Sequence, residues 1–258
     1  MCFAAKKPGI QDAVGASVDH QNITQLDIER SALGAIRTFE LPNQRFSVGI
    51  NFQLEERFLA KTLLGQTQAL VFSANDTRYK VDDELNPTRG YVVNGQIAVA
   101  SENALSDQDF LRLAFRHRGY WTPKAGHLIS TRFEIGTVLA SARNNIPQDF
   151  LFRTGGANTV RGFEYSGIGV PQQGVLQGGR RLLVGSVEYT RWFPDSPWGA
   201  AVFYDTGDVS ASWSALELES AIGVGARYRT PAGPIAFDIA KASGQDKPRF
   251  HFALGVAF

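Results

Sequence analysis

Apolar and polar residues alternate along several long stretches of this chain. In the final stretch, residues 249–258, every second side chain is large and apolar. These side chains are Phe250, Phe252, Leu254, Val256 and Phe258, and they oppose His251, Ala253, Gly255 and Ala257. The same alternation runs through residues 46–55 and 129–139. A repeat of two places the apolar side chains on one face of an extended strand, whereas a helix repeats every ~3.6 residues. The chain is therefore predicted to consist of strands with one apolar and one polar face.

The alternation predicts about twelve strands, many of them long. Their ranges are 10–22, 26–40, 45–57, 67–79, 89–101, 109–121, 127–140, 180–192, 198–207, 220–229, 234–242 and 249–258. Strands of soluble proteins commonly have about 5–6 residues, whereas a tilted strand needs roughly 9–11 to cross a bilayer. No linker or shift in composition separates the strands, so residues 1–258 are predicted to form one domain.

Two all-β architectures fit this alternation. A soluble β-sandwich alternates in the same way as a transmembrane barrel, so the alternation by itself leaves both open. Strand length favours the barrel, and so does a row of arginines on the polar face of one strand, Arg112, Arg116 and Arg118. A lumen filled with water or with a loop would accommodate such a row, as would the outer surface of a soluble sheet. We predict an antiparallel transmembrane β-barrel.

Composition excludes several other classes of protein. Lys+Arg number 26 and Asp+Glu 25, a formal net charge of +1, so no basic excess suggests a nucleic-acid partner. No run of about 18 apolar residues could form a transmembrane helix. The one cysteine, Cys2, cannot form an intrachain disulfide, and the four histidines are scattered. The G-x-S-x-G and phosphate-loop motifs are both missing. We therefore predict no enzyme activity, cofactor or metal.

The connections between the predicted strands differ in length. Segments 41–44, 122–126, 194–197 and 231–233 are short, whereas 141–179 is very long. Short turns at one end and longer loops at the other are typical of outer-membrane barrels. The long segment is rich in glycine but also contains large apolar side chains, Phe150, Phe152, Val160, Phe163 and Tyr165. We predict that it is ordered and folds back into the barrel.

Folding back would take Arg161 out of bulk water, so this side chain would need a partner. Two carboxylates on the following strands are candidates, because Glu188 and Asp205 both lie on polar faces. An arginine suits two acidic partners because its planar fork can bond both at once. The alternative is an arginine exposed in a surface loop.

Several motifs occur in an order that resembles a known family. Gly155-Gly156 followed by Val160-Arg161-Gly162-Phe163 resembles the sixth extracellular loop of the BamA/TamA superfamily, the bacterial surface-antigen barrels. Residues 203–207, from Phe203 through Asp205 to Gly207, are similar to the F-x-D-x-G strand motif of that family. Further similarities lie at residues 178–189, 231–238 and 86–90. The resemblance is sharpest over 150–258, extends weakly from about 80 to 149, and is closest to the TamA type.

The resemblance implies a site and a role. In that family the loop arginine enters the lumen and contacts acidic residues of the wall, which would be Arg161 with Asp205 and Glu188. The other residues of this loop–barrel interaction would be Gly155, Gly156, Val160, Gly162, Phe163, Phe203 and Gly207. The last strand, with Leu254, Val256 and Phe258, resembles the aromatic-ended signal by which barrel precursors are recognised. The family inserts or translocates other outer-membrane proteins, so the expected partners are membrane lipid, substrate proteins such as autotransporters, and a companion that spans the periplasm.

The family pattern is not complete in this sequence. Its members usually carry periplasmic POTRA domains and about sixteen strands, so we expect this chain to be a C-terminal barrel portion that lacks the first strands; a complete short barrel is the alternative. Two other functions stay open, a passive pore with a plug loop and the membrane barrel of a patatin-like phospholipase.

Overall fold

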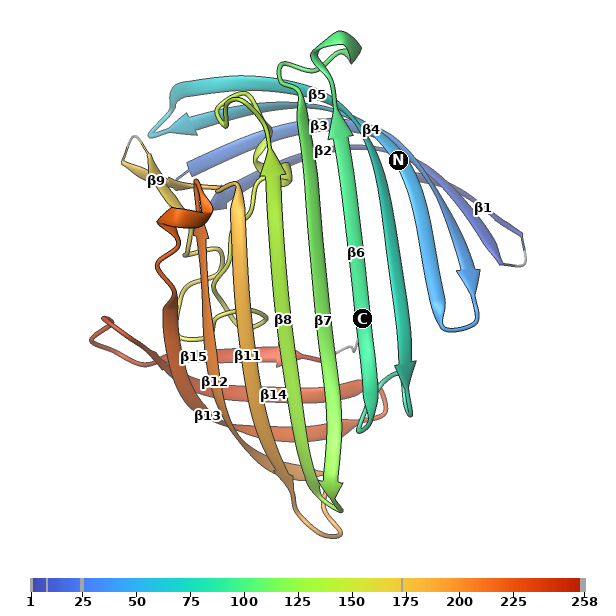
Figure 1. The fold of residues 1–258 in the computed structure, drawn as a ribbon, viewed down its shortest axis with the longest axis vertical. Helices are drawn as coiled ribbons and strands as arrows, with labels where there is room; N and C mark the ends of the chain where they lie inside the picture. Colours follow the sequence, from blue (N-terminus) through green and yellow to red (C-terminus); the bar gives the residue numbers. More distant parts are fainter. Residues whose placement is uncertain (1, 8, 24–25, 173, 256–258) are drawn as a thin grey trace.

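The computed structural model describes residues 2–7, 9–23, 26–172 and 174–255. In this part of the chain a 13-stranded antiparallel sheet follows the chain order (Figure 1). Its strands are β1 (Cys2–Lys7), β2 (Ile10–Ile23), β3 (Leu26–Leu41), β4 (Gln44–Leu59), β5 (Thr62–Val81), β6 (Gly90–Ala100), β7 (Phe110–Lys124), β8 (His127–Leu139), β11 (Arg181–Trp192), β12 (Trp198–Ser210), β13 (Glu219–Thr230), β14 (Gly233–Ala242) and β15 (Arg249–Leu254). Short 3-10 helices lie at η1 (Glu102–Ala104), η2 (Gln148–Phe150) and η3 (Trp213–Ala215).

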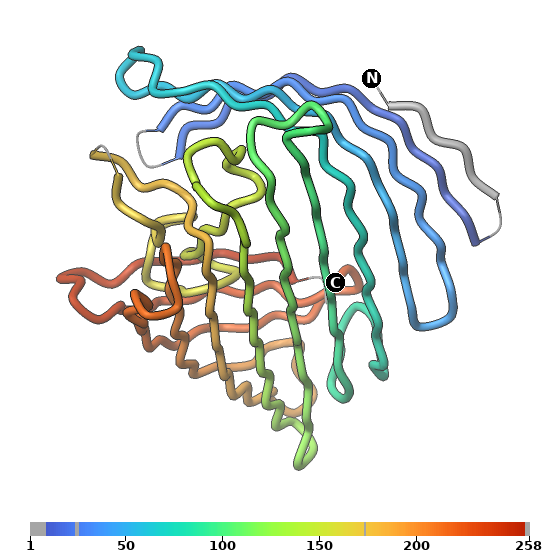
Figure 2. The backbone as a smooth tube through the Cα atoms, turned by 45° about the horizontal axis from the view of Figure 1, so that its top comes forward, coloured from blue at the N-terminus to red at the C-terminus, as the bar shows by residue number. Residues whose placement is uncertain are grey.

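The sheet curls around a central space. Figure 2 shows the first strands, in blue, facing the last strands, in red, across this space. We call β2–β5 the N-wall and β11–β15 the C-wall. The outer edges of the sheet are β1 and β15, and within the described residues no strand pairing joins them. The architecture is that of an antiparallel barrel whose wall is open between these two edges.

The two ends of the sheet carry different connections. The turns at 125–126 and 193–197 lie at one end, which we call the short-turn end (Figure 1). The connections 101–109, 140–180 and 211–218 leave the opposite end, which we call the loop end. Among the fully described connections, two depart from this rule. The segment 82–89 is long but lies at the short-turn end, and the two-residue turn 60–61 lies at the loop end.

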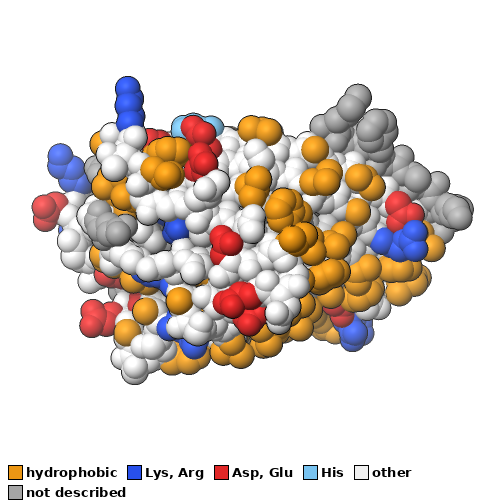
Figure 3. All heavy atoms as spheres, turned by 90° about the horizontal axis from the view of Figure 1, so that it is seen from above, with side chains coloured by type: hydrophobic (Ala, Val, Ile, Leu, Met, Phe, Trp, Pro, Cys, Tyr) orange, Lys and Arg blue, Asp and Glu red, His pale blue; other side chains and the backbone are white. Residues whose placement is uncertain are grey.

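The two faces of the sheet have opposite chemistry. On β12, Phe203 and Asp205 point into the central space and are buried, whereas Val202 and Tyr204 point outward and are exposed. The same division holds for Phe133 and Glu134 on β8. Seen from above the view of Figure 1, hydrophobic side chains gather along one outer side of the molecule (Figure 3). A soluble sandwich would bury these apolar faces against a second sheet. The sandwich alternative is therefore wrong, because the outward apolar side chains stay exposed and the sheet curls around its polar face.

Several predicted boundaries need correction. The strand predicted at 67–79 begins at Thr62, because residues 62–66 pair with β4 although their sequence does not alternate. The tight turn before it uses Ala60 and Lys61, both with positive φ. The segment before residue 10, for which no strand was predicted, forms β1. In the C-terminal strand Leu254 points outward and is exposed, whereas Val256 and Phe258 lie outside the described residues.

No helix in the described ranges is both long enough and apolar enough to span a membrane.

Candidate functional site

The long connection between β8 and β11 lies inside the curve of the sheet (Figures 1 and 2). It contains η2 and two short strands, β9 (Val170–Gln172) and β10 (Val175–Gln177), which pair with each other. Its apolar side chains join the main buried cluster of the molecule, to which the wall contributes mostly small and β-branched residues. The loop members of this cluster are Ile146, Leu151, Phe152, Val160, Phe163 and Ile168. The protein's own loop thus occupies the part of the central space nearest the loop end.

A tight turn brings Arg161 to the wall. Gly156 N donates to Val160 O at 3.0 Å and Thr159 N donates to Gly156 O at 3.1 Å. The Thr159 hydroxyl also accepts a bond from Gly155 N at 2.9 Å. The φ angles of Gly155 and Gly156 are 104° and 105°, a backbone conformation that is strained for residues other than glycine. The glycine pair therefore permits the turn from which residues 160–163 project.

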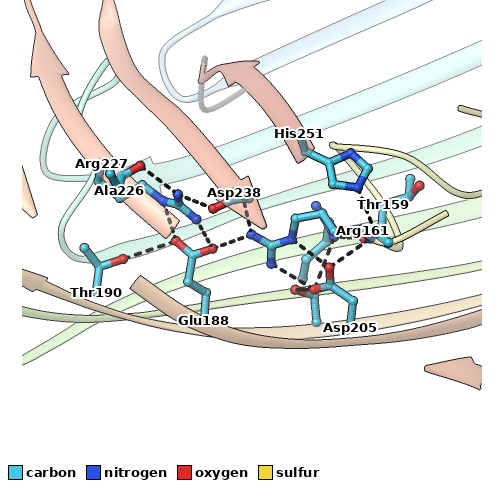
Figure 4. Close-up of polar contacts among 12 residues, drawn as sticks. Thr159, Arg161, Glu188, Thr190, Asp205, Ala226, Arg227, Asp238 and His251 are labelled. Atoms are coloured by element: carbon cyan, nitrogen blue, oxygen red, sulfur yellow. Dashed lines mark hydrogen bonds and ion pairs between the residues drawn. The ribbon is translucent and has the colours of Figure 1, made fainter. Parts of the chain in front are cut away.

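The Arg161 side chain is surrounded by three wall carboxylates. Its Nε donates to Asp205 Oδ2 at 2.7 Å and its Nη2 to Asp205 Oδ1 at 2.9 Å. Its Nη1 reaches Glu188 Oε2 at 2.7 Å and Asp238 Oδ2 at 3.1 Å. The backbone N of Arg161 adds a bond to Asp205 Oδ2 at 3.1 Å. Figure 4 shows Arg161 between Asp205 on one side and Glu188 and Asp238 on the other. We call this group the C-wall anchor.

The wall side of the anchor is held by its own bonds. Arg227 joins two of the carboxylates, because it contacts Glu188 Oε2 and Asp238 Oδ1, both at 2.6 Å. The Ser186 hydroxyl donates to Asp205 Oδ1 at 2.6 Å. Ser186 and Asp205 are direct cross-strand partners on β11 and β12. These carboxylates are therefore held on the wall by bonds that do not involve the loop.

Apolar contacts surround the ion pairs. The Arg161 guanidinium lies over the Phe203 ring, 3.2 Å from its centroid, a cation–π arrangement. Space for this ring comes from Gly223, where an added Cβ would lie 2.3 Å from the ring. Gly207 lies on β12, the same strand as Phe203, and a Cβ added there would lie 3.0 Å from the Val160 side chain of the loop. The glycines of the wall thus let the loop approach closely.

The segment after Arg161 contacts the last strands. Gly162 N donates to the imidazole Nε2 of His251 on β15 at 2.8 Å. A Cβ at Gly162 would lie only 2.9 Å from the backbone N of Ala242, and its φ is 93°. Farther out, Arg249 Nη2 contacts Glu164 Oε1 at 2.7 Å in an exposed pair. The loop therefore touches the strand that forms one free edge of the sheet.

Burial and charge act against each other at Arg161. Burial alone would lower the pKa of its guanidinium, but the hydrogen bonds and attraction of Asp205 and Glu188 outweigh burial and raise the pKa above its usual value. Asp205 has no exposed surface and Asp238 is 5% exposed, so these charges have little contact with water. Removing one partner of such a buried pair typically costs about 3–5 kcal/mol.

A second charged group holds the beginning of the loop on the N-wall. Glu55 of β4, which is fully buried, accepts bonds from Gln148 N at both carboxylate oxygens, each at 3.0 Å. Arg30 of β3 contacts Asp149 Oδ1 at 2.7 Å. Arg57 Nη2 donates to the backbone O of Asn144 at 2.8 Å. We call this group the N-wall anchor.

The structure brings together most of the residues that the sequence singled out. Arg161, Glu188 and Asp205 are in contact, and Gly162 and Phe203 lie beside them. Sequence reasoning missed four wall residues that contact the loop or its partners: Glu55, Arg227, Asp238 and His251. A signal was available for Asp238, a charged residue on the polar face of an alternating strand. The same signal was available for Glu55 in the alternating residues 46–55, but it could not show that Glu55 meets the loop, because that contact depends on the path of the loop. Among the described residues no group of three or more possible metal ligands occurs.

Fold and site together define a class of protein: an outer-membrane β-barrel with a charged loop anchored in its lumen. The Omp85 superfamily domain model matches residues 13–258, so the chain belongs to that superfamily. This membership places the chain in the bacterial outer membrane. Over 257 residues the chain is 26% identical to "Outer membrane protein assembly factor BamA" of Nitratidesulfovibrio vulgaris. The aligned region covers 90% of this chain and 32% of that protein. The chain thus spans about a third of the length of this relative.

Two solved structures have a similar fold. The structure of BamA from Haemophilus ducreyi lacking POTRA domains 1–3 matches with a TM-score of 0.77 and 16% identity, covering 96% of this chain and 58% of that one. CdiB from Acinetobacter baumannii matches with a TM-score of 0.59 and 11% identity, covering 94% of this chain and 46% of that one. At these identities the likeness concerns the fold.

Proposed function

We propose that this chain is the membrane barrel of a factor that assembles or translocates other outer-membrane proteins, autotransporters among them. The observation that carries the proposal is the burial of Arg161 among three wall carboxylates. A loop fixed in the lumen in this way is unsuited to a freely open pore. Superfamily membership supports the proposal, and the curated relative is itself named an assembly factor.

The loop residues form the working site in this proposal. Arg161 joins the loop to three strands of the C-wall, so movement of the loop and movement of these strands are coupled. His251 extends this coupling to β15, the free edge of the sheet. The residues assigned to the site are those of the loop–barrel interaction, Gly155, Gly156, Val160, Arg161, Gly162, Phe163, Glu188, Phe203, Asp205 and Gly207. The last strand is proposed as the barrel signal through Leu254, Val256 and Phe258.

The proposal assigns no reaction to the chain, since its work is to guide other polypeptides into lipid. In this proposal residues 1–258 form one barrel domain, which a single sheet in chain order and a family match over 13–258 both support. The partners that follow are outer-membrane lipid, unfolded substrate proteins and a companion that spans the periplasm.

The test replaces Arg161 in the full-length protein and measures surface delivery of a dependent autotransporter. Arg161→Ala should reduce delivery severalfold at normal protein level, because three carboxylates lose their shared partner. Arg161→Lys should be intermediate, since a lysine keeps the charge but not the planar fork. Unchanged delivery in the Ala variant, at normal level in the outer membrane, would exclude the loop anchor from the function.

A further inference from the structure

Three basic side chains lie side by side on the outer face at the short-turn end. Lys124 of β7 is the direct cross-strand partner of His127 of β8, and His127 is the partner of Arg191 of β11. His127 and Arg191 alternate in phase with outward side chains of their strands, Phe133 and Val187, which are exposed. The three residues thus form one row across three adjacent strands, which we call the basic row.

A row of large apolar side chains lies next to the basic row, on the side of the membrane interior. Ile129 pairs with Trp121 on one side and with Tyr189 on the other. Trp121 is 61% exposed although it is large and apolar. Tryptophan and tyrosine in membrane proteins gather at the level of the lipid headgroups. The basic row therefore lies just outside an aromatic belt, at the depth of the lipid phosphates.

Two of the basic side chains are held in place. Arg191 Nη1 donates to the carbonyl of Ala125 at 3.2 Å, so the guanidinium crosses the β7–β8 turn. His127 Nδ1 bonds the Tyr189 hydroxyl at 2.6 Å, and the two rings lie 5.9 Å apart. If the tyrosine donates, His127 carries its proton on Nε2, where it can bond an external acceptor. The row is thus partly ordered before any ligand binds.

The basic row has no acidic partner within the described residues. No ion pair within 4.0 Å joins Lys124, His127 or Arg191 to a carboxylate of these residues. Other arginines near the same end are paired with carboxylates. These pairs are Arg37 with Asp12 at 2.6 Å, Arg45 with Glu40 at 3.8 Å and Arg78 with Asp76 at 2.9 Å. The positive charge of the basic row is therefore available to an external anion.

We propose that the basic row binds the phosphate of an anionic phospholipid in the leaflet at the short-turn end. Arg191 would hold the phosphate through its planar fork, His127 would add a donor, and Lys124 would supply a point charge. The acyl chains would lie along the apolar outer face beyond Trp121 and Tyr189. The site does not include the lumenal loop, so the proposal stands or falls independently of the function proposed above.

The test measures which lipid contacts Trp121. The full-length protein is inserted into vesicles that contain brominated phosphatidylglycerol, which is anionic, or brominated phosphatidylcholine, which is zwitterionic. Bromine quenches nearby tryptophan fluorescence, and the signal lost in Trp121→Phe isolates the contribution of this residue. Anionic lipid should be enriched around Trp121 by roughly fivefold or more, because each interfacial basic residue contributes about 1 kcal/mol. The enrichment should fall at ~0.5 M salt through screening.

The triple variant Lys124→Gln/His127→Gln/Arg191→Gln removes the basic row. In this variant the ratio of anionic to zwitterionic lipid around Trp121 should fall close to one. If the triple variant does not fold, the single variants Arg191→Lys and Arg191→Gln replace it in the test. Arg191→Lys should retain more enrichment of anionic lipid than Arg191→Gln. The matched control is Lys241→Gln, which removes an exposed charge near the loop end of β14 and should change nothing.

Three results would overturn the proposal: equal quenching by both lipids in the parent, an unchanged ratio in the row variants, or an equal loss in Lys241→Gln. Excess inorganic phosphate at constant ionic strength distinguishes a free anion from a lipid. If phosphate removed the enrichment where chloride does not, the site would take a soluble anion and the lipid assignment would be wrong.

Discussion

The C-wall anchor and the N-wall anchor hold the same loop on opposite sides of the lumen, but they are built differently. At the C-wall the loop supplies a cation, Arg161, and the wall supplies three carboxylates. At the N-wall the loop supplies a carboxylate, Asp149, together with backbone groups, and the wall supplies Arg30 and Glu55. The loop therefore spans the lumen and contributes charges of opposite sign at its two contacts with the wall.

The two anchors also differ in how completely their polar groups are paired. At the C-wall, burial of Arg161 is outweighed by its acidic partners, so that its pKa rises. At the N-wall, partial burial raises the pKa of the Asp149 carboxyl although Arg30 opposes the change, and the Asp149 side chain stays 44% exposed. Burial likewise lowers the pKa of nearby Arg153 to about 10. Among the described residues Arg153 Nη1 and Gln148 Nε2 have no protein partner.

This difference indicates that the C-wall anchor holds the loop more strongly than the N-wall anchor does. A buried charge stabilises a contact only when its partners compensate for the lost water. The C-wall anchor meets this condition and the N-wall anchor meets it in part. We therefore expect the loop to detach first from the N-wall and to stay attached at Arg161. Three substitutions test this order.

The largest effect should follow from Asp205→Asn. This change removes the most buried partner of Arg161 with almost no change in shape, and we expect a loss of about 3–5 kcal/mol in the local stability of the C-wall anchor. Hydrogen exchange of residues 155–165 in the protein embedded in lipid should accelerate by at least about a hundredfold.

The control for this change is Asp208→Asn on the same strand. Asp208 lies on the outward face and accepts a bond from Glu217 N at 2.8 Å, so its loss should leave the lumenal loop protected. Slow exchange of 155–165 in Asp205→Asn would contradict the dominant role of this anchor.

A smaller effect is expected from Glu55→Gln. The amide keeps an acceptor for Gln148 N but loses the charge that compensates Arg30 and Arg57, at a cost of about 1–3 kcal/mol. Exchange of residues 144–150 should accelerate while 155–163 stays protected. Glu56→Gln, which alters the neighbouring residue on the other face of β4, is the matched control. Equal acceleration of both segments would show that the loop detaches as one unit.

The smallest effect should come from Arg249→Gln. This removes the exposed pair with Glu164, whose side chains are 43% and 60% exposed, and such pairs contribute at most about 1 kcal/mol. Exchange in the loop should stay within experimental error of the parent. A change as large as that of Glu55→Gln would mean that the outer contact to β15 carries more of the attachment than burial suggests.

Much of the fold could be predicted from the period of two. It identified the faces of β4, β8 and β15, because neighbouring residues of any extended strand point to opposite sides. It failed at Thr62, where a strand continues through residues that do not alternate and is held by pairing with β4. Strand ends depend on partner strands, and these are not encoded in the local pattern.

The candidate site was only partly accessible from sequence. Asp205 and Glu188 stood out as acids on polar faces, and Arg161 as a charge in a loop expected to fold back; the family resemblance implied that the three meet in the lumen. Asp238 lies 77 residues from Arg161 in the chain, and Glu55 lies 93 residues from Gln148. The alternation placed Glu55 on the polar face of β4 and Glu56 on the other, but nothing local marked Glu55 as a partner of the loop. Only the curvature of the sheet and the path of the loop bring these groups together.

The sequence by itself determined which side chains of the alternating strands share a face, since that division follows from the geometry of a single extended strand. The tertiary structure alone decided which charges meet across the lumen and which basic residues align on the outer face. Those contacts depend on the register between strands and on the closure of a long loop, and both are settled by burial and charge compensation over the whole molecule.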